Sequence, residues 1–296
     1  MAIREIKLPP FSGTLLNAAA ATIQISNIPQ GYIYKMIYLL FTGNLTKAHV
    51  ANILMTLGGK PIIPNMTGNQ LDTIYKYQGE AAAASILAIP FYQASAATEA
   101  EGRIGEIDTT PVDQNGQDKY SEFTLSLTTD SSLDYSASTV TAWALVDDDP
   151  KPVLPLANGG KYDTRDTIRG FVKQVRTLGN TGDNPFTLSV GADNKNHLRQ
   201  AHIFHSNITS FEAAKGEKTL IQRETIAGIQ FVQARQKRAV QSGHLCLDFV
   251  KDGMELNALS ILKDDNTLAA MLWNSIQSGS DNLTIYSDVY AEYKSF

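Results

Sequence analysis

Three side chains that could supply a nucleophile, a base and an acid alternate along one short segment, at His244, Cys246 and Asp248. A cysteine nucleophile needs a histidine that takes its proton, and a carboxylate orients that histidine. Residues two apart on a strand share a face but lie roughly 6.5–7 Å apart, whereas such a triad requires hydrogen-bond contact. We therefore interpret Cys246 as a small buried thiol with polar neighbours.

A second cluster, His197, His202 and His205, offers imidazole nitrogens to a metal ion. In an extended segment His202 points opposite to the other two, and neither a cysteine nor a carboxylate completes a recognisable ligand set. We interpret these histidines as ordinary polar residues of a strand.

The acidic run Asp147, Asp148 and Asp149, with Asp163 nearby in sequence, could present hard oxygen ligands to calcium. The alternative is a solvated acidic linker. Residues 113–118 superficially resemble a calcium loop, but the glycine comes two positions early and no glutamate follows at the required distance. Structural calcium at Asp147, Asp148 and Asp149 is thus the candidate metal site, and no other cofactor is expected.

The N-terminal arm mixes basic and apolar residues, since Arg4 and Lys7 alternate with Ile3, Ile6 and Leu8. Such a mixture is typical of a segment that contacts anionic lipid or a neighbouring subunit. Prolines 9 and 10 follow, and we expect them to detach the arm from the first strand.

Four basic residues flank a modest apolar stripe further along the chain: Arg223, Arg235, Lys237 and Arg238. We favour ordinary helix packing with a solvated basic face. The alternative is an interfacial contact with lipid or with a neighbouring subunit.

The phosphate-cradling motif G-x-x-x-x-G-K, the zinc motif H-E-x-x-H and the nucleophile elbow G-x-S-x-G are all absent from the sequence. The common enzyme classes that use them are therefore removed, and we predict that the chain is not an enzyme. The single cysteine excludes an internal disulfide and any four-cysteine metal site.

Composition places the 296 residues among ordinary globular proteins, with 43% hydrophobic and 19% charged residues, which excludes intrinsic disorder and coiled coil. The formal net charge is -5. A cationic face broad enough to bind nucleic acid is therefore not expected, and no specific nucleic-acid partner is predicted.

The longest apolar runs are far shorter than the roughly 20 residues of a membrane-spanning helix. The N-terminus lacks the apolar core of a secretory signal, so we expect folding in the cytoplasm.

Prolines divide the chain almost in half, because Pro150, Pro152 and Pro155 directly follow the acidic run. Each proline fixes its own φ and keeps its predecessor extended, which indicates a stiff linker. We predict an N-terminal domain over residues 1–149, a Pro/Gly linker over 150–160 and a C-terminal domain over 161–296.

Alternation of apolar and polar residues is the dominant periodic signal and predicts strands around residues 22–26, 123–127, 186–190, 245–249 and 283–285. Glycine-containing turns at 58–59 and 215–216 separate hairpin arms, and a further turn at 115–116 lies in a long polar loop. Helical spacing occurs only within 68–79 and 223–238. The fold is therefore mainly β and antiparallel, with one short helix in each half.

A shared F-x-x-N-[L/I]-T places Phe41 on Phe204 at an offset of 163 residues. In both halves the hexapeptide ends an apolar strand and precedes a hairpin, the short helix, an apolar strand and two closing strands. This order predicts two copies of one domain. We expect two tandem eight-stranded jelly-roll β-sandwiches, each with a short helix in a crossover connection, although another β-sandwich would fit the same strand pattern.

The first third of the chain resembles the double jelly-roll major capsid proteins of icosahedral bacteriophages with an internal membrane, the corticovirus-like lineage. The resemblance lies in residues 22–25, 34–40, 45–46, 50–62 and 70–77. It implies a homotrimer whose three pairs of jelly rolls form a pseudo-hexagonal tile over a lipid bilayer. The implied partners are the chain itself in a capsid lattice, minor capsid or vertex proteins, and the inner bilayer. Calcium between subunits would suit this lineage.

The function expected from this resemblance is a major capsid protein, made and assembled in the host cytoplasm and located in the virion. A carbohydrate- or receptor-binding β-sandwich, as in viral spikes and lectins, is the alternative, since such proteins use the same architecture. A glycan site favours exposed aromatic residues beside carboxylates. The two tryptophans, Trp143 and Trp273, instead lie within apolar strand-like runs, which disfavours the alternative.

Overall fold

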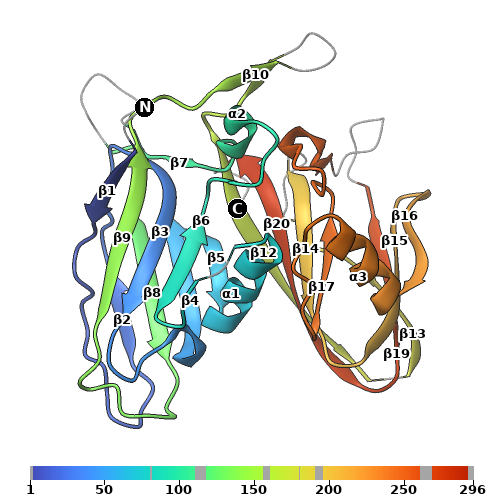
Figure 1. Ribbon diagram of the computed structural model, residues 1–296, viewed down its shortest axis with the longest axis horizontal. Helices are drawn as coiled ribbons and strands as arrows, with labels where there is room; N and C mark the ends of the chain where they lie inside the picture. Colours follow the sequence, from blue (N-terminus) through green and yellow to red (C-terminus); the bar gives the residue numbers. More distant parts are fainter. Residues whose placement is uncertain are drawn as a thin grey trace. The chain divides into compact units, whose positions relative to one another are not determined.

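The computed structural model describes residues 3–80, 82–110, 118–155, 161–179, 181–190, 196–260 and 269–292 (Figure 1). The chain forms two compact units. The first unit comprises the chain up to Lys76 together with Glu80–Gly170, and the second comprises Tyr77–Gly79 together with the chain from Phe171 onward. Each unit is described by itself.

Within the described residues, the first unit contains two antiparallel sheets that pack face to face. The β3 sheet has the order β1 (Arg4–Lys7), β9 (Val140–Asp147), β3 (Ile33–Phe41) and β6 (Ile86–Pro90), and the short β7 (Ile107–Asp108) also pairs with β3. The β4 sheet has the order β2 (Thr22–Ile25), β8 (Phe123–Thr129), β4 (Val50–Leu57) and β5 (Lys60–Met66). Three short helices accompany them: η1 (Lys47–His49), α1 (Gly68–Tyr77) and α2 (Glu99–Gly102).

The second unit repeats this plan. Its β14 sheet has the order β12 (Thr167–Leu178), β20 (Asp281–Glu292), β14 (His197–Phe204) and β17 (His244–Asp248), with the short β18 (Leu259–Ser260) also on β14. Its β15 sheet has the order β13 (Gly182–Thr187), β19 (Met271–Gln277), β15 (Ile208–Lys215) and β16 (Lys218–Thr225). Helices α3 (Ile226–Arg235) and η2 (Glu255–Asn257) complete the described elements.

Each strand of the β3 and β4 sheets therefore has a counterpart at the same place in the β14 and β15 sheets, in the same chain order. The predicted double jelly roll is confirmed, as are the hairpin turns at Gly58–Gly59 and Gly216, where positive φ angles require or favour glycine. The predicted turn at 115–116 lies outside the described residues. The short helix α2 was not expected from the sequence, because it has no apolar spacing.

Both predicted helices begin after a threonine for the same physical reason. In the first unit, the Gln70 amide donates to the Thr67 hydroxyl at 3.1 Å and the Thr67 amide donates to the Gln70 side chain at 3.0 Å. In the second, the Gly228 amide donates to the Thr225 hydroxyl at 3.1 Å. These side chains satisfy amides that the first helical turn leaves unpaired, so each helix starts where its threonine lies.

The two copies of the shared hexapeptide, which begin at Phe41 and at Phe204, do not occupy equivalent positions on their strands but differ by one residue. Both β3 and β14 contain a β-bulge, at Lys35 and at Arg199, because the pairing register shifts around these residues. Counting from the bulges, Phe41 corresponds to His205 rather than to Phe204. Accordingly Phe41 is 4% exposed and faces the core, whereas Phe204 contacts Tyr286 on the opposite face of its sheet. The duplication is confirmed by topology, and the phenylalanine identity is coincidental.

The cores lie between the two sheets of each unit, as the alternating burial of β8 shows. In the second unit, Trp273 meets Phe211 and Phe186 edge to face, with ring centroids 5.4 and 6.1 Å apart. In the first unit, Tyr34 meets Phe123 in the same way at 5.3 Å. Tyr34 and Phe123 join the two sheets of the first unit, whereas Trp273 and its partners lie on neighbouring strands of one sheet. Each such pair adds about 0.5–1.5 kcal/mol beyond its buried area.

The boundary between the compact units falls after Gly170, later than the predicted linker of residues 150–160. Lys151 explains the difference, because its ammonium is buried and donates to the carbonyls of Ile104 at 2.7 Å and Glu106 at 2.8 Å, and to the Thr167 carbonyl. The strands β10 (Val153–Pro155) and β11 (Lys161–Asp163) pair with each other directly afterwards. The segment is thus fastened to the first unit, while residues 156–160 lie outside the described part of the chain.

Each bulge carries a buried cation. In the first unit the Lys35 ammonium lies 3.1 Å from the Asp147 carboxylate and 3.6 Å from that of Glu106, and Arg103 binds Glu106 at 3.0 Å. Burial raises the pKa of Glu106, although the neighbouring cations oppose that shift. The Phe91 amide donates to the Lys35 carbonyl at 2.9 Å, so the bulge also holds the chain that leaves β6.

The second unit has the same arrangement in a stronger form. The Arg199 guanidinium is fully buried and binds Glu255 at 2.8 Å and Asp288 at 2.7 Å, while the Tyr290 hydroxyl donates to Glu255 at 2.6 Å. The Phe249 amide donates to the Arg199 carbonyl at 3.1 Å. Two carboxylates thus compensate a charge that would otherwise be costly to bury.

Replacing Arg199 by methionine should lower the free energy of unfolding by about 3–5 kcal/mol, because two buried carboxylates would lose their cation. Chemical denaturation followed by circular dichroism measures the change. The matched control is Arg223→Met, whose cation also binds two carboxylates but is half exposed, so this change should cost far less stability. Equal losses in both variants would contradict this account of the bulge.

Candidate functional site

The side chains of His244, Cys246 and Asp248 do not form a catalytic triad. His244 Nε2 lies 3.1 Å from His202 Nδ1, and the two rings stack with centroids 5.3 Å apart. Asp248 is bound to Arg238 at 2.8 Å. Burial raises the pKa of the Cys246 thiol well above its ordinary value, and the side chain is fully buried. A nucleophilic cysteine requires a lowered pKa, so the interpretation as a buried thiol holds.

The side chains of His197 and His202 do not point to opposite faces of the strand, as simple alternation predicts. The bulge at Arg199 adds a residue, so Leu198 and Ala201 both lie in the core. His197 and His202 therefore share the outer side of β14, although they are five residues apart. Among the described residues, no group of three or more His, Cys, Asp or Glu side chains is placed to hold a metal ion.

The acidic run is divided between two environments. Asp147 is buried, and although burial by itself raises the pKa of its carboxyl, the Asp149 amide and Lys35 together hold that pKa below its ordinary value. Asp148 is exposed and binds Arg4 at 2.5 Å. Asp149 donates its backbone amide to Asp147 at 3.0 Å. Cations of the chain itself thus engage Asp147 and Asp148, and the calcium site stays a prediction.

The N-terminal arm is part of the sheet rather than detached from it, because Arg4–Lys7 form β1 and pair with Trp143–Val146 of β9. The expected break at the two prolines is wrong, since their position after β1 leaves the strand's own amides free to pair. Arg4 lies beside Asp148, so the two candidate sites occupy the same end of the sheet edge. A contact of Arg4 and Lys7 with lipid or a neighbouring subunit stays a prediction.

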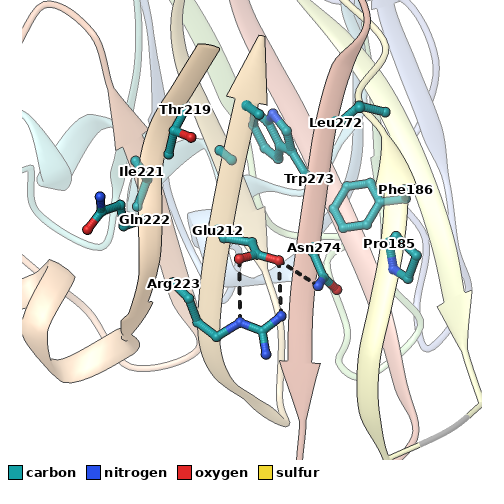
Figure 2. Close-up of a pocket in the computed structure, with 12 residues that line it drawn as sticks. Pro185, Phe186, Glu212, Thr219, Ile221, Gln222, Arg223, Leu272, Trp273 and Asn274 are labelled. Carbon is teal, nitrogen blue, oxygen red and sulfur yellow. Dashed lines mark hydrogen bonds and ion pairs between the residues drawn. The ribbon is translucent and has the colours of Figure 1, made fainter. Parts of the chain in front are cut away.

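A groove of about 430 Å³ crosses the β15 sheet of the second unit, over β13, β19, β15 and β16. Figure 2 shows its polar centre, where Glu212 lies between Arg223 and Asn274. Arg223 binds Glu212 at 3.0 Å and Asp183 at 2.8 Å, and Asn274 donates to Glu212 at 2.7 Å. Hydrogen bonds from Arg223 and then Asn274 lower the pKa of Glu212.

This groove is suited to surface contact rather than to acid–base catalysis. Its carboxylate is held ionised by two donors, whereas a general base needs a pKa near the working pH. The remaining lining is largely apolar and includes Leu272, which is 49% exposed, and Pro185. The groove therefore offers a shallow mixed surface without a nucleophile.

The buried cations Lys35 and Arg199, with their carboxylates, were not recognised from the sequence. A signal existed, because Lys35 interrupts an otherwise apolar run over Ile33–Phe41. Its partners Glu106 and Asp147 lie far along the chain, so no spacing rule connects them.

Stability should depend on pH through His244. Burial lowers the pKa of His244 from 6.5 to about 3, so the folded protein keeps this imidazole neutral while the unfolded chain takes up a proton below about pH 6.5. The free energy of unfolding should therefore fall as the pH drops from 6.5 towards 3, by about 1.4 kcal/mol per unit from this group. Denaturation at a series of pH values measures the slope. His244→Asn should flatten the slope, and an unchanged slope in this variant would refute the assignment.

Two family models match the chain and together span both units. They describe the viral coat protein P2 N-terminal domain, over residues 5–147, and the viral coat protein P2 C-terminal domain, over residues 168–293. No curated protein matches the chain by sequence.

Solved structures of viral capsid proteins share the fold. The major capsid protein P2 from bacteriophage PM2 has a TM-score of 0.78 at 12% identity, with 100% of both chains covered. The MCP of STIV has a TM-score of 0.61 at 12% identity, covering 99% of this chain and 97% of that one. VP54 of PBCV-1 has a TM-score of 0.57 at 11% identity, covering 98% and 93%. Because its two jelly rolls match both domain models in order, the chain belongs to the viral coat protein P2 family.

Proposed function

We propose that this chain is the major capsid protein of an icosahedral bacteriophage, and that it assembles as a homotrimer which then builds the capsid lattice. The observation that carries the proposal is the repetition of one jelly roll twice in a single chain. Three such chains supply six similar units around one axis. A near-sixfold tile of this kind can pave a closed shell with few distinct contacts. Proteins of this family are structural rather than enzymatic.

The proposal includes an internal membrane, minor capsid or vertex proteins as further partners, and assembly in the host cytoplasm. These features come from the resemblance to the membrane-containing phage lineage. Arg4 and Lys7 are the residues proposed to contact lipid or a neighbouring subunit, and both are exposed on the edge strand β1. Within the described residues, no helix is long and apolar enough to cross a membrane.

A carbohydrate-binding function is not favoured. Trp273 is 1% exposed and lies in the core of the second unit. Trp143 is half-buried in the middle of β9. Sugar rings stack on exposed aromatic faces beside polar groups, whereas Trp273 is sealed in the core and Trp143 is only partly exposed on an apolar sheet face.

The purified chain should be a stable trimer, with a mass three times the 32.3 kDa of one chain. Light scattering coupled to size-exclusion chromatography measures this mass, and negative-stain microscopy shows whether hexagonal tiles form. A chain that stays monomeric over a wide concentration range would overturn the proposal.

Calcium at the acidic run is the second part of the proposal that can be tested. We expect calcium to bind through Asp147, Asp148 and Asp149, where it would compete with Lys35 for Asp147 and with Arg4 for Asp148. Isothermal titration calorimetry should show binding that Asp148→Asn and Asp149→Asn abolish, while the control Asp252→Asn, in an exposed turn of the second unit, leaves it intact. Calorimetry without any heat of binding would reject the site.

A further inference from the structure

We infer that helix α3 of one copy of this chain packs on the outer face of the β3 sheet of a second copy. The outer face is the side of that sheet turned away from the β4 sheet. The inference rests on the proposed homotrimer and names the two surfaces that would join its subunits. It follows from differences in burial between corresponding positions of the two jelly rolls.

Helix α3 exposes large apolar side chains. Phe231 is 64% exposed and Val232 is 50% exposed, whereas Ile229, one turn earlier, is 9% exposed and belongs to the core. The Arg235 guanidinium lies 5.9 Å from the Phe231 ring centre. Two adjacent exposed apolar residues beside a cation, on a short helix that is already anchored on its other side, indicate a contact surface.

The corresponding helix of the first unit does not show this exposure. The helices can be aligned at their ends, because Gly79 and Lys237 have positive φ angles two residues after Tyr77 and Arg235. In this alignment Val232 takes the place of Ile74, which is only 2% exposed. The same position is thus covered in one copy of the repeat and open in the other.

Tyr77 shows what such a helix end can cover. This residue ends α1 but belongs to the second compact unit. Its ring packs edge to face on His202 and His244, with centroids 5.9 and 5.7 Å apart. Its carbonyl accepts a hydrogen bond from the Ala239 amide at 3.1 Å. Tyr77 therefore lies on the outer side of β14 and β17.

The central part of the outer side of the β14 sheet is buried. Its residues are recognised because they alternate with core residues such as Ala201 and Ile203. Four of them are 0% exposed: Gln200, His202, Tyr286 and Asp288.

The same side of the β3 sheet is open and apolar. Counting from the bulges, Met36 corresponds to Gln200 and Tyr38 to His202, and both alternate with the fully buried Ile37 and Leu39. Trp143 pairs with Tyr38 as Tyr286 pairs with His202. Met36, Tyr38, Leu40, Trp143 and Leu145 are all only partly buried.

The two open surfaces complement each other. Helix α3 carries Phe231 and Val232 beside the cation Arg235, and the face of the β3 sheet offers apolar rings with Glu5 at its edge. Glu5 pairs directly with Leu145 and Lys7 with Trp143, so both a carboxylate that can meet Arg235 and an ammonium lie at this edge of the face. Because the surfaces differ, the contact is head to tail, and three copies can close it into a ring.

Charged substitutions in α3 test the contact. The full-length double variant Phe231→Glu with Val232→Glu should weaken trimer association at least tenfold in native mass spectrometry over a dilution series, with an unchanged circular dichroism spectrum. The matched control is Val175→Glu on β12, since Val175 is 57% exposed but lies on neither surface. If the α3 double variant forms trimers as stable as those of the control variant, the inference is overturned, but the proposed homotrimer stands. A monomeric wild-type chain would overturn both.

Cross-linking tests the partner surface directly. Phe231→Cys combined with Tyr38→Cys should give disulfide-linked chains under oxidation, and mixed ¹⁴N and ¹⁵N chains should show that the linked peptides come from different copies. Each single variant is the control, because Cys246 is buried. Linked peptides from one copy only would refute the assignment. The assignment would also be refuted if the Phe231→Glu, Val232→Glu double variant remained trimeric but no longer bound phosphatidylglycerol vesicles. That result would identify lipid as the partner of α3.

Discussion

The structure depends on one constraint, which is that each sheet must bury one apolar face against its partner sheet. Alternating strands meet this constraint because every second side chain of β8 points inward and is sealed. Each unit satisfies it separately, with its own aromatic centre around Trp273 or Tyr34. The constraint also leaves every sheet with a second face, and what covers that face distinguishes the two otherwise equivalent jelly rolls.

Buried charge is the costly feature that the fold retains in both units. Lys35 and Arg199 each stand on a β-bulge, where the extra residue breaks the ladder and turns a side chain that regular alternation would place elsewhere. Carboxylates from the last strand and from the loop before the closing strands surround them. The ion clusters thus connect strands and a loop that hydrophobic packing alone would leave loosely joined at this end of the sheet.

A coat protein performs its function through surfaces rather than through a reactive centre, and the distribution of residues agrees with this. The groove over the β15 sheet holds its carboxylate in a fixed ion pair, and the only cysteine is sealed in a strand. The exposed apolar residues of α3 and the open face of the β3 sheet are instead available to another copy. Duplication explains why both exist, since each jelly roll inherits the same helix and the same sheet.

The sequence by itself determined the class of fold, the two copies and the crossover helices, because alternation, glycine turns and threonine caps act over a few neighbouring residues. It also indicated that the His244, Cys246 and Asp248 pattern is not a triad. Only the tertiary structure decided the registers at Lys35 and Arg199, the fastening of Lys151 to the first unit and the pairing of Arg4 with Asp148. These features join residues far apart in the chain, and a bulge of one residue reverses which side chains face the core.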